Sequence, residues 1–157
     1  MEMHKKFADD LIEAEKAWRT GDHLIYVTYP VVKDDKLFLR ALENLHKSLV
    51  IIISSILRFE YLYKRIELSK NGGKNLEIFF KKCGKKYGLE IDDCEIIKEI
   101  ISLGKKHKES SVEFSGKGKA YILDDLGKVE INIDKLKIFL RVIRRLLENT
   151  IVNFKNS

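Results

Sequence analysis

Proline, glycine and cysteine are scarce in this sequence. Its 157 residues include one proline, nine glycines and two cysteines. So few turn-forming residues argue against a sandwich or barrel of many short strands. Two cysteines are too few for a disulfide framework. We expect Cys83 and Cys94 to be reduced thiols, with one disulfide across the glycine-containing turn between them as the alternative.

The sequence also lacks a long hydrophobic run. The most apolar run, residues 49–53, is far shorter than the roughly 20 residues that a helix needs to cross a bilayer. Residues 1–6 are polar and charged, and no apolar signal segment follows them. We therefore expect a cytoplasmic protein without a membrane partner, folded as a single helical domain over residues 1–157.

The chain does contain a long series of apolar residues at helical spacing. The spacings alternate between four and three along the series Phe38, Leu42, Leu45, Leu49, Ile52, Ile56, Phe59, Tyr63 and Ile66. This pattern is the seam of a long helix that packs against other helices along its length. Asp34 or Asp35 is the predicted N-cap, and the helix is expected to run to about Ser69, where Asn-Gly-Gly at 71–73 stops it.

An earlier helix is predicted from about Met3 to Tyr29, with a kink at Gly21. A strand over 24–29 is the alternative, because Ile, Tyr, Val and Thr favour strands. Pro30 is expected to end the element in either case, since it has no amide hydrogen.

Later in the chain, helices are predicted over about 76–87 and 92–104, and the last helix over 134–154, with Asp134 as its N-cap. Between them, about 110–133, apolar and polar residues alternate around glycines, which is typical of a β-hairpin or small meander. The predicted fold is therefore mainly α, an antiparallel five-helix bundle with a small β segment before the last helix.

Residues 49–57 are apolar on nearly every side of their helix. Such a segment lies either at the centre of a bundle or against a second subunit. We expect self-association as a homodimer.

Arg40, Glu43 and His46 are the candidates for chemistry. Glu43 and His46 form one E-x-x-H pair, whereas di-iron bundles use two such pairs and two further Glu residues, so we expect no metal site and no cofactor. Arg40 and His46 could bind phosphate and move protons. They lie about 120° apart on a straight helix with ~9 Å of rise, so cooperation would need a distorted helix or a second subunit. An ordinary exposed Arg and His are the alternative.

Lysine- and arginine-rich clusters are the candidate nucleic-acid-binding residues: Lys81, Lys82, Lys85 and Lys86; Lys105, Lys106 and Lys108; Arg144 and Arg145. On one shared face they would bind phosphates with an affinity that falls with salt. The sequence leaves open whether they share a face, and a mixed solubilising surface is the alternative. Some tyrosines could stack on bases or pack in the core: Tyr61, Tyr63, Tyr87 and Tyr121.

Three stretches resemble a group of small archaeal helical proteins without an assigned function: Tyr-Val-Thr-Tyr-Pro-Val-Val-Lys-Asp at 26–34, Phe-Glu-Tyr-Leu-Tyr-Lys-Arg-Ile at 59–66, and His-Lys-Glu-Ser-Ser-Val-Glu-Phe-Ser at 107–115. More distantly, the long helix hairpin is similar to HEPN domains. These helical bundles, often dimeric, occur in RNA-cleaving toxins and in non-catalytic nucleotide-binding partners. Their catalytic signature, an Arg followed after roughly four to six residues by a His, matches Arg40 and His46 in spacing.

Three functions follow from these patterns. The first is a non-enzymatic, dimeric helical module that binds RNA or another polyanion through its lysines. The second, implied by the HEPN resemblance, is a metal-independent ribonuclease that uses Arg40 and His46. The third is a protein-interaction scaffold that uses the apolar side of 49–57.

Overall fold

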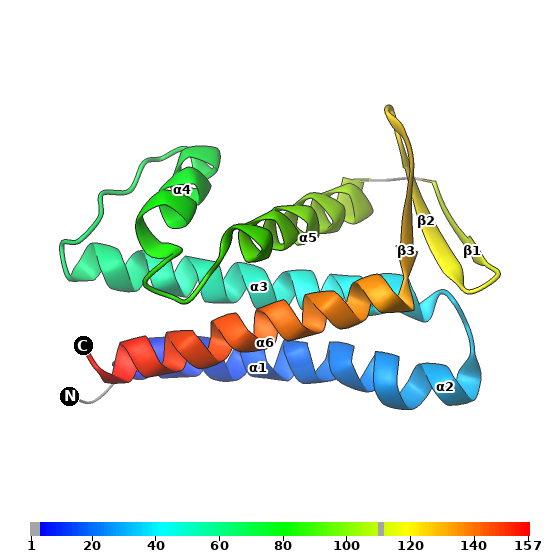
Figure 1. Ribbon diagram of the computed structural model, residues 1–157, viewed down its shortest axis with the longest axis horizontal. Helices are drawn as coiled ribbons and strands as arrows, with labels where there is room; N and C mark the ends of the chain where they lie inside the picture. The colour runs from blue at the N-terminus through cyan, green and yellow to red at the C-terminus, as the bar shows by residue number, and fades with distance from the viewer. Residues whose placement is uncertain (1–3, 110–111) are drawn as a thin grey trace.

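The computed structural model describes residues 4–109 and 112–157, so the predicted starts of the first helix at Met3 and of the β segment at 110 lie outside the described residues. Figure 1 shows the arrangement of the elements. Their bounds are Lys5–His23 (α1), Leu24–Thr28 (η1, a π-helical turn), Tyr29–Val32 (α2), Leu37–Leu62 (α3), Gly72–Ile78 (α4), Phe79–Cys83 (η2, also π-helical), Ile91–Glu109 (α5), Glu113–Gly116 (β1), Lys119–Asp124 (β2), Gly127–Asn132 (β3) and Ile133–Lys155 (α6). The predicted fold class, a mainly α bundle with a small β meander before the last helix, is confirmed.

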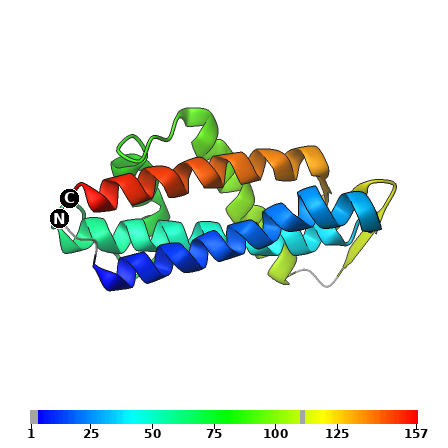
Figure 2. The ribbon, with the colours of Figure 1, turned by 90° about the horizontal axis from the view of Figure 1, so that it is seen from below.

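The central helix of the bundle is α3. It packs against α1, α5 and α6, and both views show α1 and α6 alongside it (Figures 1 and 2). Its fully buried apolar residues are Phe38, Ala41, Leu42, Leu45, Leu49, Ile52 and Ile56. Residues 49–57 are apolar nearly all round because α3 meets three neighbours there. The central position accounts for this composition without a second subunit, and the homodimer stays a prediction.

The first helical segment continues past Gly21 and Pro30, the two residues predicted to kink it or end it. At Gly21, α1 approaches α3 so closely that a Cβ atom would lie 2.8 Å from a leucine side chain of α3. Of the two interpretations of 24–29, the helix is correct. The prediction that Pro30 ends the element is wrong. Within η1 the Tyr29 N–H donates to the Leu24 carbonyl, five residues back, and Pro30 falls in the first turn of α2, where a missing N–H is tolerated.

The long helix ends at Leu62, well before the predicted end at Ser69. The chain turns at Lys64, whose φ is 60°. Asn-Gly-Gly begins α4 instead of stopping α3, because the Asn71 side chain accepts a hydrogen bond from the Lys74 N–H at 3.2 Å. Asn and Gly serve at both ends of helices, so their presence alone did not decide which end this was. The helix predicted over 76–87 is α4 followed by η2.

Two helix ends also differ from the prediction. Gly104 does not end the fourth helix, because α5 continues to Glu109. A Cβ atom at Gly104 would lie 2.1 Å from the His46 ring, so the glycine permits α5 to pack directly on α3. The N-cap of α6 is Asn132, whose side chain accepts a backbone N–H at 2.9 Å, and not Asp134.

The three strands form an antiparallel sheet in the order β1-β2-β3, at the opposite end of the bundle from α4 (Figure 1). Ala120, Ile122 and Ile131 are its buried residues. Asp35, a predicted N-cap, instead accepts the Gly118 N–H at 2.9 Å and fixes the β1–β2 turn to the bundle. None of the helices in the described ranges is long and apolar enough to cross a membrane.

Candidate functional site

The most lysine-rich part of the chain folds as one corner of the molecule. Residues 61–89 form the last residues of α3, the loop after it, α4, η2 and the turn into α5, at the end of the bundle away from the sheet (Figure 1). They contain eight Lys and Arg and two Asp and Glu, which gives +6. The other residues contain twenty-two of each sign. The whole net charge of the protein therefore lies in this segment, which we call the cationic corner.

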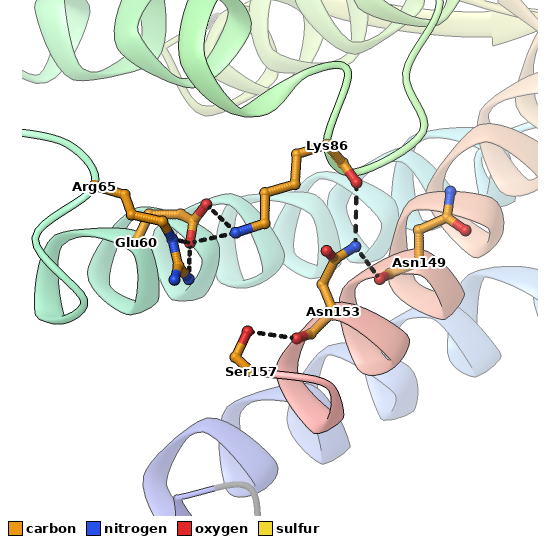
Figure 3. A network of polar contacts seen from close by, with 6 residues as sticks. All are labelled: Glu60, Arg65, Lys86, Asn149, Asn153 and Ser157. Atoms are coloured by element: carbon orange, nitrogen blue, oxygen red, sulfur yellow. Dashed lines mark hydrogen bonds and ion pairs between the residues drawn. The ribbon is translucent and has the colours of Figure 1, made fainter. Parts of the chain in front are cut away.

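A buried carboxylate anchors the cationic corner to α3. Glu60 is only 2% exposed. Its carboxylate accepts a hydrogen bond from Arg65 Nε at 2.8 Å, and two from Lys86 Nζ at 2.8 and 3.1 Å (Figure 3). A buried carboxylate is stable when cations and hydrogen bonds replace its water. Glu60 therefore joins the loop after α3 to the turn after η2.

The backbone turn after α3 brings Arg65 back to Glu60. Lys64 takes the left-handed conformation, and its N–H donates to the Tyr61 carbonyl at 3.0 Å. The Arg65 N–H then donates to the carbonyl of Glu60 itself at 3.0 Å. The main chain and side chain of Glu60 thus hold the same residue, which fixes the direction of the loop that follows.

The other side of the corner is fastened to α6. Asn153 donates from its side chain to the Lys86 carbonyl at 3.2 Å, and Asn149 to the Tyr87 carbonyl at 3.0 Å (Figure 3 shows both asparagines). The turn needs glycine at Gly88, where φ is 77° and a Cβ atom would lie 2.3 Å from the Asn149 side chain. The corner is therefore a fixed part of the bundle.

Six lysines of the cationic corner make no ion pair with any residue that the structure describes, and all six are exposed: Lys64, Lys70, Lys74, Lys81, Lys82 and Lys85. Three of the predicted binding residues, Lys81, Lys82 and Lys85, are in this set. The fourth residue of that cluster, Lys86, is committed to Glu60. A surface of unpaired ammonium groups is the part of a protein that attracts phosphates most strongly.

Arg144 and Arg145, the predicted binding residues of α6, are paired with carboxylates. Arg144 pairs with Glu15 of α1 at 2.8 Å and with Glu148 at 3.0 Å. Arg145 pairs with Asp93 of α5. These pairs leave little excess charge for an external phosphate.

The α5 lysines lie toward the sheet end of the molecule, away from the cationic corner (Figure 1). Lys106 pairs with Asp124 of β2 at 3.1 Å, while Lys105 and Lys108 are exposed. The helix rises about 1.5 Å per residue, so these lysines are separated from the start of α5 by most of its length. The three predicted clusters are thus not placed together at one end of the bundle.

Arg40 and His46 have different environments. Arg40 is exposed, whereas His46 is buried beneath Gly104 of α5. Burial, together with the positive charges of Lys108 and His107, holds the pKa of His46 below its usual value. Within the described ranges, no hydrogen bond joins the Arg40 and His46 side chains. Both residues lie on the helix α3, where six residues place their side chains about 120° apart with ~9 Å of rise, so they do not meet within one chain.

Glu43 is paired with His107 of α5 and not with His46. His107 contacts Glu113 of β1 at 2.5 Å and Glu43 at 3.3 Å. Burial lowers the pKa of His107, but the hydrogen bonds and charges of the two carboxylates outweigh burial and raise it. In the part of the chain that the structure describes, no group of three or more His, Cys, Asp or Glu side chains is arranged to hold a metal ion.

The two cysteines are free thiols in this structure. Cys83 is buried in η2, and burial raises the pKa of its thiol to about 11. A thiol held in its protonated form is a poor nucleophile. Cys83 therefore acts as a core residue of the corner.

Glu60 and Arg65 were missed by the sequence prediction, and the roles of the tyrosines were left open. Tyr61 and Tyr63 are 56% and 40% exposed, whereas Tyr87 is fully buried. The available signal was the sequence Tyr-Leu-Tyr-Lys-Arg at 61–65, where two tyrosines are followed directly by two basic residues. It lay inside the predicted long helix and was interpreted as part of its seam.

Comparison with known proteins gave no match to a family model, to a curated protein or to a solved structure. The chemistry of this chain is therefore the basis for any functional conclusion.

Proposed function

We propose that this protein is a non-enzymatic helical module that binds RNA through its cationic corner. The observation that carries the proposal is the location of the charge. The whole net charge of +6 lies in residues 61–89, and six exposed lysines there make no ion pair with any described residue. A polyanion that contacts these lysines releases its condensed counterions, which drives binding at low salt.

The test is binding of a fluorescently labelled single-stranded oligoribonucleotide, followed by anisotropy from low to physiological salt. Wild type is compared with two triple variants that remove the same charge. The first changes Lys81, Lys82 and Lys85 to Gln. The second, a matched control, changes Lys105, Lys108 and Lys117 to Gln, which are exposed lysines without an ion pair in the described ranges and lie at the sheet end.

We expect wild type to bind with an affinity that falls as salt rises. The corner variant should reduce the slope of log K against log salt by about 0.7 for each phosphate that the protein no longer neutralises, roughly 2 in all. The control variant should leave the slope nearly unchanged. Absence of salt-dependent binding by folded wild type, or an equal loss in both variants, would refute the proposal.

The same reactions are analysed on a gel for cleavage, since the ribonuclease interpretation uses Arg40 and His46. Cleavage without added metal that disappears in a folded His46→Ala variant would refute a non-enzymatic module and support the ribonuclease instead. Self-association is part of the proposal and is measured by light scattering. A cytoplasmic location, in which thiols such as Cys83 stay reduced, is also part of it.

A further inference from the structure

Tyr63 and Arg65 form a cation–π pair on the surface of the cationic corner. The guanidinium carbon of Arg65 lies 4.8 Å from the centroid of the Tyr63 ring and 5.7 Å from that of Phe59. Both Tyr63 and Arg65 keep over a third of their side-chain surface exposed. Glu60 accepts hydrogen bonds from two nitrogens of the Arg65 guanidinium (Figure 3), so the guanidinium is held in place before any ligand arrives.

A surface groove is lined by Arg65 of this pair. Tyr63 does not line the groove itself but contacts the Arg65 guanidinium that does. The groove has a volume of about 370 Å³ and is lined by Lys64, Arg65, Ile66, Glu67, Ile78 and Lys82. Two ammonium groups, one carboxylate and an apolar wall from two isoleucines thus surround the same space. The volume is at the lower end of the range of small-ligand sites, about 300–1,000 Å³, which suits one nucleotide.

We propose that this groove binds one unpaired nucleotide of an RNA strand, with the base stacked against the Tyr63–Arg65 pair and the phosphate near Lys64 and Lys82. The inference rests on the proposed RNA-binding function and narrows it to single strands. Aromatic rings and guanidinium planes are the surfaces on which proteins stack unpaired bases. In a duplex the faces of the bases are covered by their neighbours, so the pair could not reach them.

Glu67 favours a nucleotide over a bare phosphate as the ligand. A carboxylate repels phosphate oxygens, but it accepts hydrogen bonds from the amino and imino groups of a base. The groove therefore offers lysines for the phosphate of a nucleotide. For the base it offers the Arg65 guanidinium that lies over Tyr63, an apolar wall and a hydrogen-bond acceptor.

A second exposed tyrosine with a cation over its ring provides a comparison. Tyr26 is 50% exposed, and Lys137 Nζ lies 5.2 Å from its ring centroid. Its groove is lined by Asp22, Glu148 and arginines of α6, of which Arg144 is paired with carboxylates. This tyrosine has similar exposure and lies outside the cationic corner, so it is a matched control.

The experiment measures the affinity of wild type for three labelled probes of equal length: single-stranded RNA, the same ribose-phosphate strand without bases, and duplex RNA. Inorganic polyphosphate is used as competitor. The same measurements are made on Tyr63→Leu, which keeps an apolar side chain but removes the ring, on Tyr63→Phe, which keeps the ring, and on Tyr26→Leu. Circular dichroism reports whether each variant is folded.

We expect wild type to bind the strand with bases at least fivefold more tightly than the strand without bases or the duplex. Tyr63→Leu should lower affinity for the base-containing strand by about 5- to 100-fold, the range for loss of one base stack, and leave binding of the strand without bases within about twofold. Tyr63→Phe and Tyr26→Leu should bind like wild type.

Two results would overturn this inference while the proposed function stands. One is equal affinity of wild type for strands with and without bases, a comparison that needs no variant. The other is a folded Tyr63→Leu variant that binds like Tyr26→Leu. Failure of wild type to bind any probe or polyphosphate at low salt would overturn the inference and the proposed function together.

Discussion

Both ends of the bundle contain paired and unpaired lysines, but the cationic corner has a large excess of cations over carboxylates and the rest of the chain has none. At the sheet end, Lys106 pairs with Asp124, Lys119 with Glu130 at 3.1 Å, and Lys135 with Glu99 at 3.2 Å. In the cationic corner, Glu60 takes Arg65 and Lys86, and six further lysines make no ion pair with any described residue. The same residue types therefore build a balanced surface at one end and an unbalanced one at the other.

This difference shows that a lysine cluster in a sequence gives an unbalanced positive surface only if distant carboxylates leave it unpaired. Arg144 and Glu15 are 129 positions apart, yet their side chains meet at 2.8 Å. No local pattern reveals such a pair. In the cationic corner the local excess of cations is too large for the available carboxylates to cancel.

The largest effect is expected from Glu60→Gln, which leaves Arg65 and Lys86 without their shared carboxylate. Removing one partner of a buried ion pair costs about 3–5 kcal/mol, and partial exposure of the two cations reduces the expected loss to about 2–3 kcal/mol. Urea unfolding measures it. The control, Glu148→Gln, removes an exposed partner of Arg144 and should cost less than about 1 kcal/mol. Equal losses in the two variants would mean that Glu60 does not anchor the corner.

Charge reversal at single lysines tests the two ends directly. Lys82→Glu should weaken RNA binding at low salt by about tenfold, because it places a negative charge in the groove beside Lys64. Lys105→Glu, at the other end of α5, should change affinity by less than about twofold. Anisotropy titrations measure both. A larger effect at Lys105 would mean that RNA binds at the sheet end and not at the cationic corner.

A double substitution tests whether the pairing of Arg144 with carboxylates limits RNA affinity. Changing Glu15 and Glu148 to Gln together removes both carboxylates from Arg144. RNA affinity should rise by about two- to fivefold, and the salt slope should steepen by about 0.7 if the freed Arg144 neutralises one phosphate. The control changes Glu109 and Asp125, two exposed acids, to Gln and Asn. If the control raises RNA affinity equally, the affinity depends on the net charge of the protein and not on the pairing of Arg144.

The smallest effect concerns pH. The folded pKa of His107 is raised above its ordinary value of about 6.5. Its contact with Glu113 and Glu43 therefore stabilises the fold fully below about pH 6.5 and loses that effect as pH rises through the raised pKa. The folded pKa of His46 is lowered, so its contribution is instead lost as pH falls from about 6.5.

Urea unfolding of wild type and His107→Gln across this range separates the two histidines. The difference in free energy of unfolding between them should be largest at low pH and shrink as pH rises. A difference that stays constant with pH would show that His107 stabilises the fold by packing and not by charge.

The fold class was predictable because its signals are local and repeated. The four-three spacing from Phe38 onward identified the central helix, and alternation around glycines identified the meander. The predicted helix ends were wrong where one residue type can serve two structural roles. Asn71 was interpreted as part of a helix stop but is an N-cap, and Gly104 was interpreted as a terminator but permits a close contact with His46.

The candidate site was predictable only in part. Lys81, Lys82 and Lys85 were identified from their clustering, and they are exposed and without an ion pair in the described ranges. Glu60 was not identified, because its burial depends on two cations that reach it from a turn and from a segment 26 positions away. Whether Tyr63 is exposed depends on where α3 ends, and that end was predicted too late in the chain.

The most direct test of RNA binding by the cationic corner is an NMR titration of ¹⁵N-labelled protein with single-stranded RNA, since it needs no mutation. We expect the amide signals that shift to belong to the cationic corner, residues 61–89, and above all to the residues around Tyr63, Lys64 and Lys82. Shifts concentrated at the sheet end or around the α6 arginines, with the corner unchanged, would contradict this expectation.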